Sequence, residues 1–181
     1  MTMDDVMYVT HEMMDYLRGE GDTLSVVTTV EGQEQDFFNE QDRFHMGEVR
    51  ELFIGGLNIR FGACVAAVLC VLFLVITRAD IKKVVPRSYW IALGVTGAAV
   101  ILIGIAAVVD FNAVFVQFHH IFFDNDLWIF DPAEDYMIRM LPEGLFYDMV
   151  MRIGAIFVVS LVVLLVLSFI PKIADRRKKL V

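Results

Sequence analysis

Three long apolar runs alternate with polar segments along the chain. They read LNIRFGACVAAVLCVLFLVI, YWIALGVTGAAVILIGIAAVV and IGAIFVVSLVVLLVLSFI, at residues 57–76, 89–109 and 153–170. About 20 apolar residues cross a hydrocarbon core of about 30 Å, and inside lipid the backbone must satisfy its own hydrogen bonds. The pattern therefore predicts an all-α polytopic membrane protein with three transmembrane helices, placed at residues 57–77, 89–109 and 150–170.

The polar segments between these runs differ sharply in charge. Residues 1–56 hold thirteen acidic and three basic side chains, and residues 110–149 hold eight and one. The loop 78–88 holds four basic and one acidic side chain, and the tail 171–181 holds five and one. Because basic loops stay in the cytoplasm, we expect the loop and the tail to lie inside. The two acidic segments then form a small extracytoplasmic cap.

The expected export of residues 1–56 raises a difficulty at the start of the chain. Nothing in MTMDDVMYV is apolar enough to act as a signal peptide or an anchor. We therefore expect a fourth, N-terminal span that is missing ahead of this sequence. The alternative is that the first apolar run carries the acidic segment across the membrane as an N-terminal tail.

The acidic segment 1–56 carries patterns typical of regular structure. Apolar spacing predicts a helix over residues 5–18, and the β-branched stretch 24–30 predicts a short strand or an extended segment. A second helix is expected over residues 39–53, with Asn39 as its N-cap. On that helix the expected apolar stripe is formed by Phe44, Val49 and Leu52. His45 lies beside the stripe.

The other acidic segment, 110–149, contains the stretch FHHIFFDNDLWIFDP at residues 118–132. A helix over residues 111–123 is expected to continue the second span outward, and Pro132 forbids helix farther on. A lone histidine is most often a surface or capping residue. His45 and His119, however, are expected at the boundary between cap and membrane, among aromatic or charged residues that can hold an imidazole neutral. Two neutral imidazoles can divide acid and base work.

Simpler interpretations and other chemistries remain open for these residues. Phenylalanine and tryptophan near the end of a span usually form an interfacial belt. His119, His120 and Asp124 could cluster, but their spacing matches no specific ligand pattern, so no metal is expected. The chain has no GxSxG motif, and its net charge of −8 argues against a nucleic-acid partner.

The stretch FHHIFFDNDLWIFDPAEDYMIRMLPEGLF resembles the signature of the lipoprotein intramolecular transacylase family, which are bacterial integral membrane proteins. Upstream, RFHMGEVREL resembles the short histidine motif of that family, with His45 in the matching place. The positions shared with the longer signature are Phe118, His119, Phe122, Phe123, Trp128, Pro132, Asp135, Ile138, Pro142 and Phe146.

The resemblance implies a four-span protein of the bacterial cell membrane with its active site on the extracytoplasmic face. The implied substrate is a diacylglyceryl lipoprotein held among membrane lipids. Its sn-2 acyl chain moves from the glyceryl oxygen to the α-amino group of the N-terminal cysteine, which yields an N-acyl lyso-form lipoprotein. No cofactor is implied. His45 and His119 are the expected acid and base, with neither role assigned to one of them.

Supporting roles follow from residue type and membership of the motif. Asn125, Trp128 or Arg139 could stabilise an oxyanion. Asp135 could orient a histidine or pair with Arg139. The substrate-binding aromatic pocket is expected to be formed by Phe118, Phe122, Phe123, Trp128 and Phe130. Two alternatives are a non-catalytic cap that binds a lipid or peptide, and a metal-dependent membrane hydrolase.

Overall fold

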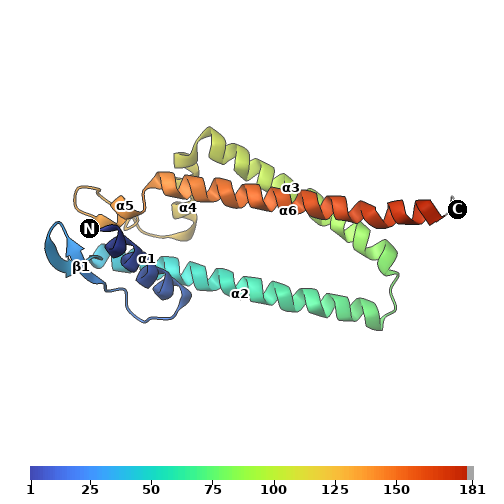
Figure 1. Ribbon diagram of the computed structural model, residues 1–181, viewed down its shortest axis with the longest axis horizontal. Coiled ribbons are helices and arrows are strands. Elements are labelled where there is room, and N and C mark those ends of the chain that lie inside the picture. The colour runs from blue at the N-terminus through green and yellow to red at the C-terminus, as the bar shows by residue number, and fades with distance from the viewer. Residues whose placement is uncertain (179–181) are drawn as a thin grey trace. The chain divides into compact units, whose positions relative to one another are not determined.

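The computed structural model describes the backbone of residues 1–178 and the side chains of residues 1–81 and 83–166 (Figure 1). The last residues of the tail expected to be cytoplasmic, 179–181, lie outside the described part. The chain divides into two compact units. The first unit combines Met1–Cys70 with Val116–Pro142, and the second combines Val71–Phe115 with the chain from Glu143 onward.

The expected membrane spans are confirmed as three long apolar helices in the described chain. They are α2 (Glu40–Ile76), α3 (Ile81–Val109) and α6 (Glu143–Lys178). Most of their apolar side chains are exposed, as in helices whose neighbours are lipid. The protein is therefore a mostly helical membrane protein. Residues 40–56 of α2 contain most of the charged side chains of that helix and precede its apolar stretch.

The predicted N-terminal helix is confirmed as α1 (Met3–Arg18) in the first unit. Thr2 and Asp5 form a capping box at its start, and Gly19 ends it in a left-handed conformation with φ 85°. The buried face consists of Val9, Met13, Tyr16 and Leu17.

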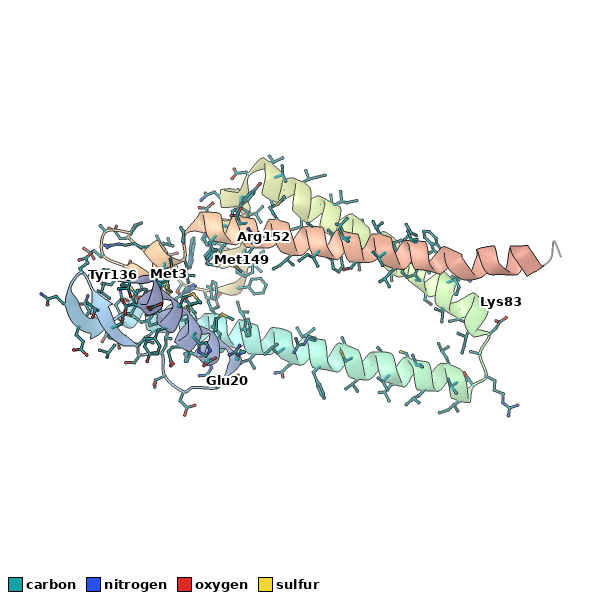
Figure 2. The ribbon with its side chains drawn as sticks, in the orientation of Figure 1. Met3, Glu20, Lys83, Tyr136, Met149 and Arg152 are labelled. Carbon is teal, nitrogen blue, oxygen red and sulfur yellow. The ribbon has the colours of Figure 1, made fainter. Side chains whose placement is uncertain are left out.

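A two-stranded antiparallel hairpin follows α1, formed by β1 (Val27–Val30) and β2 (Gln33–Asp36). Glu31 and Gly32 join the strands with φ of 53° and 85°, the pair of positive values that a type I′ turn requires. The extended segment predicted at 24–30 is confirmed in part as β1, whereas the polar β2 was not predicted. Tyr136 lies by the hairpin (Figure 2). Gln35 of β2 donates to its hydroxyl at 3.4 Å.

The hydrophobic core of the first unit brings together α1, the hairpin segment, the start of α2 and the short helix α5 (Tyr136–Met140). Phe38 is only 1% exposed and Val9 is fully buried. The other core side chains are Met13, Tyr16, Leu17, Leu24, Val26, Val30, Phe37, Met46 and Met137. This core fixes the first turns of α2 against the segment that precedes Pro142.

Helix α2 is one continuous helix where two were expected. Asn39 caps it as predicted: its side-chain oxygen accepts from the Asp42 amide at 2.9 Å, and the Asp42 carboxylate accepts from the Asn39 amide at 3.0 Å. Of the predicted apolar stripe, Phe44 is 53% exposed, while Val49 packs, partly buried, against the core. The buried positions of this helix are Asp42, His45 and Met46. The face turned inward is therefore largely polar.

Helix α4 (Phe111–Phe122) is not a continuation of the second span, contrary to the prediction. Asp110 ends α3 with an extended backbone, φ −154°, and its carboxylate accepts from the Ala113 amide at 2.9 Å, which begins the new helix. In the second unit α3 packs against α6, and the Tyr89 hydroxyl lies 3.4 Å from the Leu161 carbonyl.

Replacing Asn39 by alanine should destabilise the first unit by about 1–3 kcal/mol. The substitution removes the cap of α2 together with the hydrogen bond that the side-chain amide of Asn39 donates to Asp135 at 2.7 Å. Thermal unfolding of the purified protein in detergent measures the loss. The control is Thr2→Ala, which removes the exposed cap of α1 alone and should cost less. Equal losses in the two variants would contradict the bridging role of Asn39.

Candidate active site

The two histidines singled out from the sequence lie together in the first unit. His45 comes from the second turn of α2 and His119 from the last turn of α4. Their ring centroids are 5.9 Å apart with the planes inclined by 26°, so the rings stack. The side chains are 6% and 7% exposed. Two segments separated by more than seventy residues thus bring one buried imidazole each to the same place.

Aromatic rings surround the histidine pair. Trp128 stacks on His119 at 4.6 Å between centroids. Phe123 and Phe130 present their edges to His45 at 4.9 and 5.5 Å. These three residues of the expected aromatic pocket are therefore brought to the site, and Phe123 is only 4% exposed.

The other two residues of the expected aromatic pocket lie farther out. Phe118 meets His119 edge-on at 5.5 Å but is 45% exposed. Phe122 is 49% exposed and packs against Phe118 at 4.7 Å. Their exposed faces leave them available to an apolar ligand, but Phe122 makes no described ring contact with either histidine.

The surroundings of His45 favour its neutral form. Burial, together with the neighbouring His119, lowers the pKa of His45 to about 4. At neutral pH the ring therefore carries one proton and one free lone pair. Such an imidazole can accept a proton during a reaction and return it later.

Three polar atoms around the pair are buried without a hydrogen-bond partner: Nδ1 of His45, Oε2 of Glu48 and Nε1 of Trp128. Buried polar atoms are usually paired, so each exception in a native protein calls for an explanation. His45 Nδ1 and Glu48 Oε2 are 3.9 Å apart. The indole N–H of Trp128 is a donor held beside His119.

The loop between α4 and α5 is held against α2 by side chains of that helix. The amide of Gln41 donates to the carbonyls of Leu127 and Ile129, both at 3.0 Å. Asn125 donates to Glu48 Oε1 at 2.7 Å and accepts from the Leu127 amide at 2.9 Å. These bonds fix Trp128 in the loop relative to the histidine of α2.

A second buried polar group lies one turn before His45. Asp42 is fully buried. Burial and the nearby Asp135 raise the pKa of Asp42 to about 6, against the lowering effect of the Asn39 hydrogen bond and the Arg43 charge. Asp135 is 6% exposed and accepts from the side-chain amide of Asn39 and from the backbone amide of Asp131, each at 2.7 Å. Asp135 therefore anchors its own loop to the start of α2.

The roles expected for Asp135 and Arg139 beside the histidines are not supported by their contacts. Asp135 makes its described bonds to Asn39 and Asp131. The three nitrogens of the Arg139 guanidinium donate to the carbonyls of Pro132 and Ala133 and to Glu31 of the hairpin. The donors of Arg139 are therefore engaged by the loop carbonyls and by Glu31, and its role is to tie the loop to the hairpin.

The remaining histidines lie outside the pair. His120 meets Trp128 edge-on at 5.4 Å. His11 is exposed on α1, with Nδ1 3.2 Å from Asp15. Among the described residues, no group of three or more His, Cys, Asp or Glu side chains is arranged to hold a metal ion.

Glu48 and Asp42 were missed in the sequence analysis, although a signal for them exists. Asp42, His45 and Glu48 follow one another at intervals of three, so they share one face of a helix. The apolar stripe lies on the neighbouring face. The row of polar residues that includes His45 marks the side of the helix that is buried.

The fold and the site together define a multi-pass membrane protein with a buried, ring-flanked histidine pair. The family model of the lipoprotein intramolecular transacylase Lit matches residues 1–146. The chain belongs to this family and is an acyltransferase.

One solved structure is similar over almost the whole chain. It is the membrane integral lipoprotein intramolecular transacylase Lit from Bacillus cereus, with a TM-score of 0.77 and 21% sequence identity. The match covers 98% of this chain and 77% of that one. At this identity the likeness concerns the fold. No curated protein matches the chain significantly.

Replacing Asp42 by asparagine should stabilise the protein at pH 7.5 by up to about 3 kcal/mol and leave it unchanged near pH 4. The pKa of Asp42 is raised, so the folded protein binds its proton between about pH 4 and 6 where the unfolded chain has lost it. Stability therefore falls as pH rises through this window, and a neutral amide avoids the loss. Thermal unfolding at the two pH values measures the difference from wild type.

Asp36, a carboxylate whose pKa is lowered in the folded protein, serves as the control. Burial acts to raise the pKa of Asp36, but hydrogen bonds from Ser25, Phe38 and Val26 and the charge of Arg43 lower it overall. Asp36→Asn should therefore destabilise the protein at pH 7.5, with the effect fading as pH falls. Equal behaviour of the two variants would contradict the environment described for Asp42.

Proposed function

We propose that this protein transfers an acyl chain within one diacylglyceryl lipoprotein. The chain leaves the sn-2 glyceryl ester and joins the α-amino group of the N-terminal cysteine, giving an N-acyl lyso-form lipoprotein. The observation that carries the proposal is the stacked, buried pair of His45 and His119. Family membership supports a lipoprotein as the class of substrate.

The first step needs a base. An α-amino group is largely protonated at neutral pH, so its proton must be removed before the nitrogen can attack the ester carbonyl. One imidazole of the pair takes this proton. The nitrogen then bonds to the carbonyl carbon, and the carbonyl oxygen becomes an oxyanion.

The second step needs an acid. The nitrogen gives up its second proton as the carbon–oxygen bond to the glyceryl group breaks, and that proton passes through the other imidazole to the leaving oxygen. An amide and a glyceryl hydroxyl result, and the first proton, taken from the ammonium, is released to solvent. Two imidazoles 5.9 Å apart can serve the two reacting ends of one substrate.

Trp128 is the best-placed donor for the oxyanion among the three side chains expected in this role. Its indole N–H is buried beside His119 and has no partner among the described residues. The Asn125 amide is engaged with Glu48, and Arg139 is engaged with the loop and the hairpin. A fixed donor aimed at developing charge contributes a large part of catalysis in acyl transfer.

The rings around the histidines suit an intramolecular reaction. The amine and the ester lie on one substrate but several bonds apart, so the protein must hold them together, and orientation of this kind supplies roughly 7–11 kcal/mol in the best cases. Phe123 and Phe130 both contact the His45 ring in edge-to-face arrangements. A ring-lined site also keeps out the water that would hydrolyse the ester.

The active site belongs on the extracytoplasmic face of a bacterial cell membrane in this proposal. The support is the distribution of charge, with basic side chains in the loop 78–88 and acidic side chains in residues 1–56 and 110–149. The substrate and the surrounding lipids reach the site from that side, and no cofactor takes part.

His45→Ala and His119→Ala should each abolish the transfer, because each removes one of the two proton carriers. The measurement is mass spectrometry of a lipoprotein made in a host that lacks N-acylation, in which an amide-linked chain on the N-terminal cysteine marks the product. Protein level in the membrane is followed by immunoblotting.

The matched control is His11→Ala, which removes an exposed histidine on α1 and should leave the product unchanged. Full product formation in either variant of the pair would remove the proposed acid–base roles. A different result would favour a metal-dependent hydrolase: release of a free fatty acid from the lipoprotein that stops when a chelator is added.

Thiol labelling tests the orientation in the membrane. In a background with Cys64 and Cys70 replaced by alanine, Glu34→Cys in the hairpin should react with a membrane-impermeant thiol reagent in intact cells. Ser88→Cys, in the first turns of α3 after the basic side chains, should react only after the cells are lysed. The reverse pattern would place the candidate site in the cytoplasm.

A further inference from the structure

Glu48 and His45 present two unsatisfied buried atoms to each other. Oε2 of Glu48 and Nδ1 of His45 have no hydrogen-bond partner, and they lie 3.9 Å apart on successive turns of α2. A carboxylate oxygen accepts and an imidazole N–H donates, so the two atoms are chemically complementary. Closing the gap to hydrogen-bond length takes about 1 Å of side-chain movement. Catalytic hydrogen bonds are often this long before substrate is bound.

The Glu48 carboxylate is held in place from its other oxygen. Asn125 donates to Oε1 at 2.7 Å, and the Leu127 backbone amide holds Asn125 in turn at 2.9 Å. Only 27% of the Glu48 side chain is exposed. The loop that carries Trp128 thus fixes the carboxylate, and the carboxylate faces the histidine. Such an arrangement is typical of a group that orients an imidazole.

We propose that Glu48 is the positioning residue of His45, with Asn125 as its support. Glu48 accepts the Nδ1 proton of the neutral ring, which fixes the tautomer in which Nε2 carries the free lone pair. Nε2 then exchanges protons with the substrate, and the carboxylate stabilises the imidazolium formed when it accepts one. This assignment rests on the proposed function and adds to it the atom through which His45 acts.

The rival role for Glu48 is to hold the loop through Asn125 alone. The substitution Glu48→Gln separates the two roles. The glutamine oxygen can still accept from Asn125, so the loop stays attached. Its amide nitrogen would face His45 and donate, so the ring must accept at Nδ1 and carry its proton on Nε2. The substitution therefore reverses the tautomer with little change in the loop.

The direct measurement is the tautomer of His45 in the full chain, purified in detergent with ¹⁵N-labelled histidine. The two ring nitrogens have different ¹⁵N shifts when protonated, and a spectrum of His45→Gln assigns the signals. We expect the Nδ1–H form in the wild type and the Nε2–H form in Glu48→Gln. The titratable groups that face His45 are Glu48 on its own helix and His119 on α4, so the spectra are compared at one neutral pH.

The kinetic measurement uses a synthetic diacylglyceryl lipopeptide as the probe. Glu48→Gln should lower kcat by about 100-fold or more with KM nearly unchanged, since the wrong tautomer leaves no lone pair for the substrate. Its thermal unfolding midpoint should match the wild type. Glu48→Asp, which keeps the carboxylate, should recover part of kcat. Asn125→Ala should lower kcat less than Glu48→Gln does, because the carboxylate remains.

Two results would overturn the assignment. One is an Nε2–H tautomer of His45 in the wild type, and the other is a Glu48→Gln variant that is folded and as active as the wild type. Should Glu48→Gln fail to fold, the wild-type spectrum alone decides. A wild-type protein inactive on the lipopeptide would count against the proposed function, whereas the tautomer spectra would still decide the role of Glu48.

Discussion

The structure of the first unit depends on a row of polar side chains on one face of its longest helix. Asp42 and His45 are buried on this face of α2, Glu48 is half-buried, and the exposed cap residue Asn39 stands one turn ahead of them. A buried polar group without a partner costs free energy, so hydrogen bonds from another segment stabilise this face. The loop before α5 supplies them at both ends of the row, where Asp135 accepts from Asn39 and Asn125 donates to Glu48, while Oδ1 of Asp42 and Nδ1 of His45 have no partner among the described residues. Helix and loop therefore order each other.

The chemistry of the site follows from this mutual burial. Because the loop covers α2, His45 is removed from water and its pKa is lowered to about 4 by that burial and by His119. Aromatic rings complete the cover without adding charge. An imidazole in such surroundings stays neutral and reactive at physiological pH. The same contacts that hold the fold together thus keep the His45 imidazole unprotonated at neutral pH.

Much of this architecture was readable from the chain because the strongest signals are local. Long apolar runs predict spans whatever surrounds them. His45 and His119 were predicted to matter from their motifs, and the structure brings them together. The features that escaped prediction depend on partners distant in sequence. The strand QEQD has little intrinsic preference for a sheet and forms because the Glu31–Gly32 turn returns it to β1.

The same reasoning explains the errors over polar side chains. Arg139 has the chemistry to bind an oxyanion, but its guanidinium donates to the carbonyls of Pro132 and Ala133 in its own loop. Phe44 was expected in an apolar stripe from helical spacing, yet it is 53% exposed, whereas Asp42 is buried and accepts from the Asn39 backbone amide. Sequence spacing identified which side chains share a face, and only tertiary contacts decided which face turned inward.

The stack of Trp128 on His119 has an optical consequence. The chain contains two tryptophans, and the other, Trp90, lies in α3. An indole in contact with an imidazole loses much of its emission when that imidazole takes up a proton. With Trp90 replaced by phenylalanine, the intrinsic fluorescence of the protein would come from the one indole at the histidine pair. The molecule thus contains its own spectroscopic reporter of the protonation state of His119.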